Sequence, residues 1–115
     1  MTEETLADRL VTFIRERGSG VSFVELERQF PDEFRGDGSM SAHGYRNIVL
    51  WEPISPDMVE AINVSIGAGL IEMHPTQPMV YFIDGKVFNA PIARKARDYK
   101  YPRWLPVAFN ALGTT

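Results

Sequence analysis

The sequence contains no cysteine and only two histidines. Without cysteine there can be no disulfide framework and no thiolate metal ligand, which fits a reducing compartment. His43 and His74 are far apart in the sequence and lack a neighbouring cluster of ligand residues, so we expect no metal site and no cofactor. Cysteine and histidine commonly act as nucleophile and as general acid or base, and with so few of them the sequence does not indicate an enzyme.

Long apolar runs and an early basic segment are also missing. A membrane-spanning helix needs roughly 18 or more consecutive apolar residues, and the first residues are acidic where a signal peptide is basic. We therefore expect a cytoplasmic protein with no membrane partner. The length of 115 residues suits one domain, and a hydrophobic content of 44% is enough for a real core.

Charge is distributed unevenly, although the net charge is only −3. Acidic side chains outnumber basic ones in residues 1–85, whereas residues 86–115 contain a single acid, Asp98. The basic side chains of that second part are Lys86, Arg94, Lys95, Arg97, Lys100 and Arg103. This asymmetry indicates either a basic segment that binds a partner or one that folds back onto the acidic body.

Helical spacing and capping patterns predict two helices in the first part of the chain. Apolar side chains recur every three or four residues over 5–17, which predicts an amphipathic helix. Ser22 and Glu25 match a capping box for a second helix over residues 23–30. Between the two helices, Val21 suits a short strand.

The middle of the chain has weaker signals. Residues 31–46 are rich in Gly, Ser and Asp, lack a clear period and predict a long loop. Because a loop of this length is uncommon in a small domain, part of it is a candidate for a short helix. Residues 47–51 form a short apolar run typical of a buried strand, and we expect Trp51 to lie in the core with its indole N–H needing one partner.

The segment from Ser55 to Gly85 carries the clearest pattern. Ser55 followed by Pro56 gives a capping residue and a proline at the first helical position, and apolar residues then recur at helical spacing. Two apolar runs, residues 70–74 and 79–83, flank the sequence PTQP and predict a β-hairpin. Residues 86–88 suit a third short strand.

The order of these elements resembles the winged helix-turn-helix superfamily. The segments that carry the resemblance are TLADRLVTFIRER, SFVELERQF, SPDMVEAINVSIGAGL and LIEMHPTQPMVYFI. The expected fold class is α+β: a small winged-helix-like domain over residues 1–89, with three helices and a β-hairpin wing. Residues 90–115 would form a basic and aromatic C-terminal extension that packs on this body or on a partner.

The resemblance implies a recognition helix over residues 57–67 and a wing tip over residues 74–78. Many winged-helix proteins place that helix in the major groove of DNA, and others use the scaffold for protein contacts. This sequence departs from the DNA-binding pattern, because the outward positions Asp57, Glu60 and Asn63 include no cation. Phosphates repel carboxylates, so such a helix is unsuited to DNA by itself.

The first functional hypothesis is a nucleic-acid-binding regulator that uses the basic segment and the wing. Cations interleaved with aromatic rings suit phosphate contact and base stacking. The candidate nucleic-acid-binding residues are Arg94, Lys95, Arg97, Lys100, Arg103, Asn63, Thr76 and Gln77.

The second hypothesis is a protein-interaction or assembly module on the same scaffold. Tyr99, Tyr101 and Trp104 would then form an interface with the body, with a second copy of the chain or with another protein, since exposed aromatic patches commonly mark interfaces. The direction in which the cations after Ala93 point distinguishes the two hypotheses.

Overall fold

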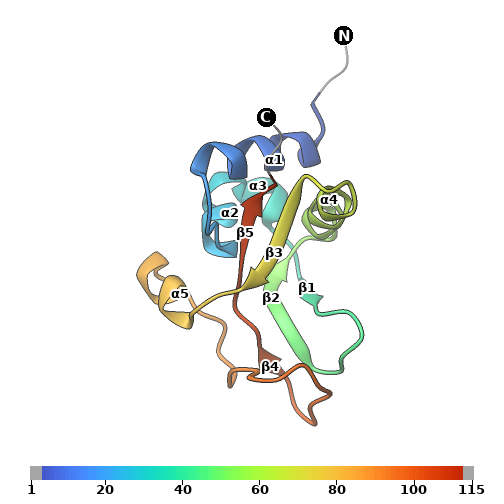
Figure 1. Ribbon diagram of the computed structural model, residues 1–115, viewed down its shortest axis with the longest axis vertical. Helices are drawn as coiled ribbons and strands as arrows, with labels where there is room; N and C mark the ends of the chain where they lie inside the picture. Colours follow the sequence, from blue (N-terminus) through green and yellow to red (C-terminus); the bar gives the residue numbers. More distant parts are fainter. Residues whose placement is uncertain (1–3, 113–115) are drawn as a thin grey trace.

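The computed structural model describes residues 4–112, which form five helices and five short strands. Figure 1 shows α1 to α4 gathered at one end and β4 at the other. The elements are α1 (Leu6–Arg17), α2 (Phe23–Gln29), α3 (Pro31–Phe34), β1 (Gly38–Ser41), β2 (Ile48–Ile54), α4 (Pro56–Gly67), β3 (Ile71–Pro75), α5 (Pro78–Asp84), β4 (Arg103–Trp104) and β5 (Val107–Ala111). The protein is an α+β domain.

Reciprocal capping boxes begin α1 and α2. The Thr5 hydroxyl accepts a hydrogen bond from the Asp8 amide, and the Asp8 carboxylate accepts one from the Thr5 amide. Ser22 and Glu25 repeat the arrangement at the start of α2. Each pair satisfies amides that have no partner within the helix. These contacts confirm the two helices expected near the start of the chain.

A serine cap and a proline also begin α4, as the sequence predicts. The Ser55 hydroxyl accepts a hydrogen bond from the Met58 amide at 3.0 Å, and Pro56 occupies the first turn. Met58 and Ile62 are fully buried against the core. The helix expected after Ser55 is therefore confirmed.

Strand β5 joins distant parts of the chain into one sheet. It pairs antiparallel with β3, in register from Ile71 opposite Ala111 to Pro75 opposite Val107. On its other side, Phe109 exchanges backbone hydrogen bonds of 3.0 and 2.8 Å with Val21. The second sheet has the order β1–β2–β4, with β1 antiparallel and β4 parallel to β2.

The hairpin predicted for residues 70–83 is wrong. Strand β3 forms as expected, but its partner is β5, and residues 79–83 lie in helix α5. Pro78 occupies the first turn of α5, and Gly85 ends it with a left-handed φ of 95°. A proline at the start and a left-handed glycine at the end are helix boundaries. A short apolar run between them fits a helix as well as a strand.

Contacts with α2 hold α5 in place. The Ser22 hydroxyl donates to the Asp84 carboxylate, the Arg28 guanidinium donates to the Asp84 carbonyl, and Lys86 forms an ion pair with Glu27 at 2.8 Å. Because these partners are far away in the sequence, local patterns do not reveal them. Residues 86–88, expected as a third strand, contain no strand.

The segment expected as a long loop contains two short elements. Residues 31–46 include helix α3 and strand β1, so the number of helices also differs from the predicted three. The strand expected at residues 47–51 is confirmed as β2 and continues to Ile54. The Ser55 amide donates to the Phe34 carbonyl at 2.9 Å, which ties α3 to the start of α4.

Five aromatic side chains from separate segments form the centre of the core: Phe23, Trp51, Tyr81, Trp104 and Phe109. The ring centroids of Trp51 and Tyr81 lie 5.3 Å apart, and those of Tyr81 and Trp104 lie 5.0 Å apart. Among the described residues, the Trp51 indole N–H has no hydrogen-bond partner. Trp104 and Phe109 therefore pack in the same core as side chains from the first 89 residues.

Candidate functional site

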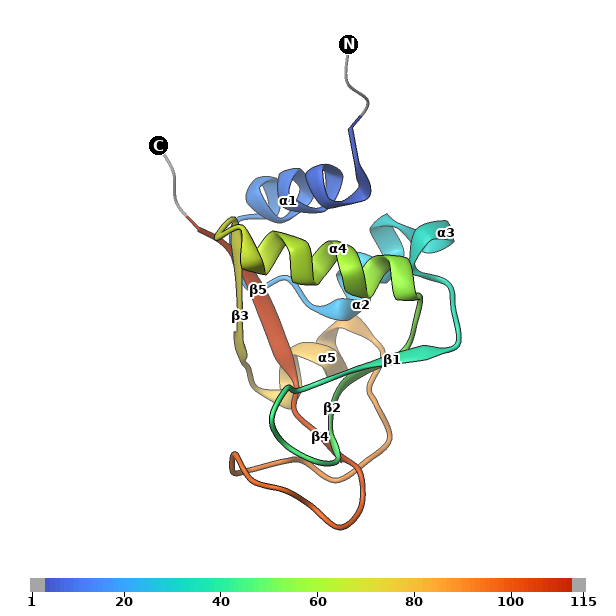
Figure 2. The ribbon, with the colours of Figure 1, turned by 90° about the vertical axis from the view of Figure 1, so that its right-hand side faces the viewer.

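The cations that follow Ala93 lie at the end of the molecule that is opposite α1. Figures 1 and 2 both place the loop between α5 and β4 at this end, beside the turn that joins β1 to β2. We call this part of the surface the basic end and define it by its six cations. They are Arg46, Arg94, Lys95, Arg97, Lys100 and Arg103.

Hydrogen bonds of backbone and side-chain groups connect this loop to the β1–β2 turn. The Arg46 amide donates to the Asp98 carboxylate at 2.8 Å, and the Tyr99 amide donates to the Arg46 carbonyl at 3.0 Å. The Asn47 side chain donates to the Tyr99 carbonyl at 2.9 Å, and the Asn47 carbonyl accepts from the Arg103 amide at 2.8 Å. Asn47 has a φ of 64°, a left-handed conformation that asparagine tolerates better than most residues. These bonds bring Arg46 beside the cations of the loop.

Tyr99 is the internal support of the loop. Its side chain is buried, and its hydroxyl bonds both the amide and the carbonyl of Lys95, at 3.1 and 3.0 Å. The guanidinium carbons of Arg97 and Arg103 each lie 5.0 Å from the centre of its ring. The hydrogen bond from the Lys95 amide, assisted by Arg97, lowers the pKa of Tyr99 from its ordinary value. Tyr99 therefore positions cations, and its own ring is not free to bind a partner.

None of the six cations of the basic end forms an ion pair with a carboxylate of residues 4–112. The ion pairs within residues 4–112 join Arg9 to Glu33, Arg17 to Glu25, Arg35 to Asp32 and Lys86 to Glu27. All of them lie outside the basic end. The one acid in the loop, Asp98, accepts a backbone hydrogen bond instead. Arg94, Lys95, Arg97 and Lys100 are exposed, so their charge is available to an external anion.

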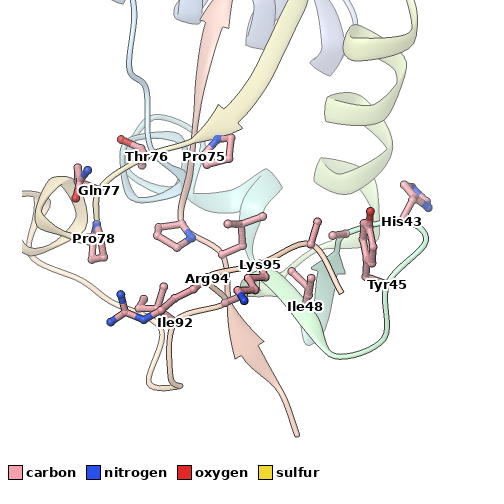
Figure 3. Close-up of a pocket in the computed structure, with 15 residues that line it drawn as sticks. His43, Tyr45, Ile48, Pro75, Thr76, Gln77, Pro78, Ile92, Arg94 and Lys95 are labelled. Atoms are coloured by element: carbon pink, nitrogen blue, oxygen red, sulfur yellow. The ribbon is translucent and has the colours of Figure 1, made fainter. Parts of the chain in front are cut away.

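A groove of about 640 Å³ opens at the basic end. Figure 3 shows His43 and Tyr45 on one side, Thr76, Gln77 and Pro78 on the other, and Arg94 and Lys95 between them. Its apolar surface comes from small and aliphatic residues, namely Ala42, Ile48, Pro75, Pro78, Ile92, Ala93, Ala96, Leu105 and Pro106. The structure thus brings Thr76 and Gln77, expected at a wing tip, next to two of the predicted cations.

Asn63 is not part of this surface. It is exposed on α4, whose position away from the β4 end is clear in Figures 1 and 2. The neighbouring depression on that side is lined by Glu33, Asp57 and Glu60 and contains no cation. The expected recognition helix therefore faces solvent with acidic side chains and lies apart from the basic end.

The three aromatic residues expected at an interface have different environments. Trp104 is 2% exposed, and its indole N–H donates to the Leu50 carbonyl at 3.2 Å. Tyr99 is 7% exposed, whereas Tyr101 is 70% exposed, with the Lys100 ammonium 5.9 Å from its ring centre. Trp104 and Tyr99 thus pack within their own chain, and Tyr101 alone of the three has a free ring.

Sequence reasoning missed Tyr45 and Arg46. They belong to the segment that we expected to be an irregular loop, and both are exposed: Arg46 is one of the six cations of the basic end, and Tyr45 is its neighbour in the chain. Their signal is an aromatic residue next to a cation, the same pairing that marks residues 94–104. Hydrogen bonds from the Arg46 amide to Asp98 and from the Tyr99 amide to the Arg46 carbonyl help to connect the two segments, and neither bond is visible in the sequence.

Across residues 4–112, no three His, Asp or Glu side chains are grouped so that they could hold a metal ion. Within the same part of the chain, no helix combines the length and the apolar character needed to cross a membrane.

No family model, curated protein or solved structure matches this chain. The case for a function therefore rests on the geometry and charge of the basic end.

Proposed function

We propose that this protein binds nucleic acid through its basic end. The observation that carries the proposal is that none of the six cations there forms an ion pair with a carboxylate of the described residues. Lys and Arg side chains that neutralise phosphates and release counterions provide most of the affinity of nucleic-acid-binding proteins. An acidic protein requires such a concentrated basic surface to overcome its overall repulsion of a polyanion.

A winged-helix scaffold is part of the same proposal. Its support is the order helix, short strand, helix, helix and strand, which α1, Val21, α2, α4 and β3 follow. Strand β5, which pairs antiparallel with β3, would be the second strand of the wing. Residues 76–106 then form an insertion between the two wing strands, and this insertion carries most of the cations. Contact with nucleic acid would occur through the inserted segment and the β1–β2 turn, whereas α4 would not enter a groove of DNA.

The salt dependence of binding tests the proposal. We expect the wild-type protein to bind a labelled oligonucleotide at about 50 mM salt. The logarithm of the association constant should fall with the logarithm of the salt concentration, with a slope of roughly −3.5 to −4 for five or six single-strand phosphate contacts. Fluorescence anisotropy over a series of salt concentrations measures this slope. Absence of binding at the lowest salt concentration would reject the proposal.

Self-association is a second candidate function, and one exposed apolar surface favours it. Met79, Phe82 and Ile83 are 62%, 63% and 78% exposed. They occupy positions i, i+3 and i+4 of α5 and therefore share one helix face. Contiguous apolar surface of this kind is typical of interaction sites. The proposed partner is a second copy of the chain, with the two α5 faces in contact.

Replacing Phe82 and Ile83 together with serine tests this second candidate. If the α5 faces meet, we expect the wild-type protein to dimerise with a dissociation constant on the order of tens of micromolar, which is a weak association. The double variant should remain monomeric. Val64→Ser is a suitable control, because Val64 is 54% exposed on α4. Sedimentation equilibrium measures the mass. A wild-type protein that is monomeric at every concentration would exclude self-association.

A further inference from the structure

We infer that the groove at the basic end holds an unpaired nucleobase, so that the protein prefers single-stranded nucleic acid to a duplex. This inference rests on the proposed nucleic-acid binding and specifies its substrate class. The groove, of about 640 Å³, has the size of a site for a small organic group. A double helix cannot enter such a site, whereas one base that has left the stack can.

The lining of the groove suits a base ring better than a phosphate. Ile48 and Ala93 are 2% and 5% exposed and form part of an apolar floor. Burying an unpaired charge on such a floor is costly, but burying a flat aromatic ring is favourable. Tyr45 is 43% exposed at the side of the groove and offers a ring on which a base can stack.

The polar groups at the rim supply the remaining contacts of a nucleotide. Arg94 and Lys95 extend from the loop without a carboxylate partner among the described residues, and so complement the charge of the flanking phosphates. On the other side, Thr76 and Gln77 provide hydroxyl and amide groups that can bond the edge of a base. In a single strand, unstacked bases expose these edges together with the backbone.

The groove is preformed by hydrogen bonds within the protein. The Thr76 amide donates to the Pro106 carbonyl at 2.9 Å, and the Ala93 amide donates to the Trp104 carbonyl at 2.8 Å. On the loop side, the Tyr99 hydroxyl fixes the backbone of Lys95. Because the lining is held in place before binding, little conformational entropy is lost when a base enters.

A duplex lacks the feature that the groove would recognise. Its bases are stacked inside the helix, and unstacking and unpairing one of them costs free energy that a single strand does not lose. A duplex can therefore contact the cations of the rim while the groove stays empty. We expect single strands to bind roughly tenfold or more tightly than a duplex of the same length, the effect of one base–aromatic stack.

The test compares a labelled single-stranded oligonucleotide with its duplex for three tyrosine variants. Tyr45→Ala should weaken single-strand binding roughly tenfold and leave duplex binding unchanged, while Tyr45→Phe should retain the wild-type preference. Tyr101→Ala is the matched control, because Tyr101 is exposed at the same end but does not line the groove. Circular dichroism and thermal unfolding establish that each variant is folded.

The outcomes separate this inference from the proposed function. If neither single strands nor duplexes bind, the proposed function fails and the inference fails with it. If both bind with equal affinity, or if Tyr101→Ala weakens single-strand binding as much as Tyr45→Ala does, nucleic-acid binding stands and the inference about the groove is overturned. Selective loss of single-strand affinity in Tyr45→Ala, with recovery in Tyr45→Phe, supports it.

Discussion

Replacing Arg94, Lys95 and Lys100 together with glutamine is expected to weaken nucleic-acid binding on the order of a hundredfold at 0.1 M salt. Each cation that neutralises a phosphate of a single strand contributes about 0.7 to the slope of log K against log salt. Losing three contacts should therefore reduce the magnitude of that slope by about 2. These three side chains are exposed and form no ion pair with the described carboxylates, so the fold should be unaffected.

The choice of these three cations follows from the packing of the loop. Arg97 and Arg103 are retained because their guanidinium groups lie over the ring of Tyr99, and their removal would also disturb the support of the loop.

A matched control separates local contacts from overall charge. Replacing Arg15, Arg17 and Arg35 with glutamine removes the same number of charges from exposed positions outside the basic end. Two of these residues form surface ion pairs, each worth at most about 1 kcal/mol, so the control protein should remain folded. Anisotropy titrations at several salt concentrations compare the two triple variants. Equal loss of affinity in both would show that binding depends on net charge, and would argue against a site at the basic end.

Phe109→Ala is expected to lower the free energy of unfolding by about 3–5 kcal/mol, the usual cost of removing a buried aromatic side chain. Phe109 is fully buried in β5, and its ring meets that of Phe23 edge to face, with centroids 5.1 Å apart. A small domain is stable by only about 5–15 kcal/mol, so the variant should be partly unfolded near body temperature. Urea denaturation followed by tryptophan fluorescence measures the loss.

Phe82→Ala is the control for this prediction, because it makes the same chemical change at a side chain that is 63% exposed. Its effect on the free energy of unfolding should stay within about 0.5 kcal/mol. Similar small effects in both variants would mean that β5 is a peripheral extension of an independent domain formed by the preceding residues. A large loss in Phe109→Ala alone supports a core that includes β5.

Local capping contacts explain why helices α1, α2 and α4 were predictable from the sequence. Thr5, Ser22 and Ser55 each cap a helix within three residues of themselves, so their effect is visible in a short window. The hairpin failed for the opposite reason, because the partner of β3 lies beyond residue 106 and no short window contains it. The run around Tyr81 folds as a helix, and the Tyr81 hydroxyl donates to the Val107 carbonyl at 2.6 Å, which is another contact between distant parts of the sequence.

The candidate site also has a part that was predictable from the sequence and a part that was not. Five of its six cations were visible as a basic segment. The sixth, Arg46, and the adjacent Tyr45 are far away in the sequence, and the hydrogen bonds of the Arg46 backbone with Asp98 and Tyr99 place them beside that segment. The sequence also did not indicate which aromatic side chains are buried. Trp104 and Tyr101 are only three residues apart in the chain, yet Trp104 is 2% exposed and Tyr101 is 70% exposed. Which ring is buried depends on the pairing of β4 with β2, and that pairing is set by the tertiary fold.

The pairing of β5 with both Val21 and β3 has a consequence for biosynthesis. A ribosome delivers a chain vectorially, from the amino terminus onward, so Val21 and β3 leave the exit tunnel well before their shared partner. Until residue 111 has emerged, the edge of β3 has no backbone partner, and the nascent polypeptide exposes a hydrogen-bonding edge and apolar surface to which chaperones can bind. Closure of the sheet must then be a late event, and pairing of segments so distant in sequence favours slow folding.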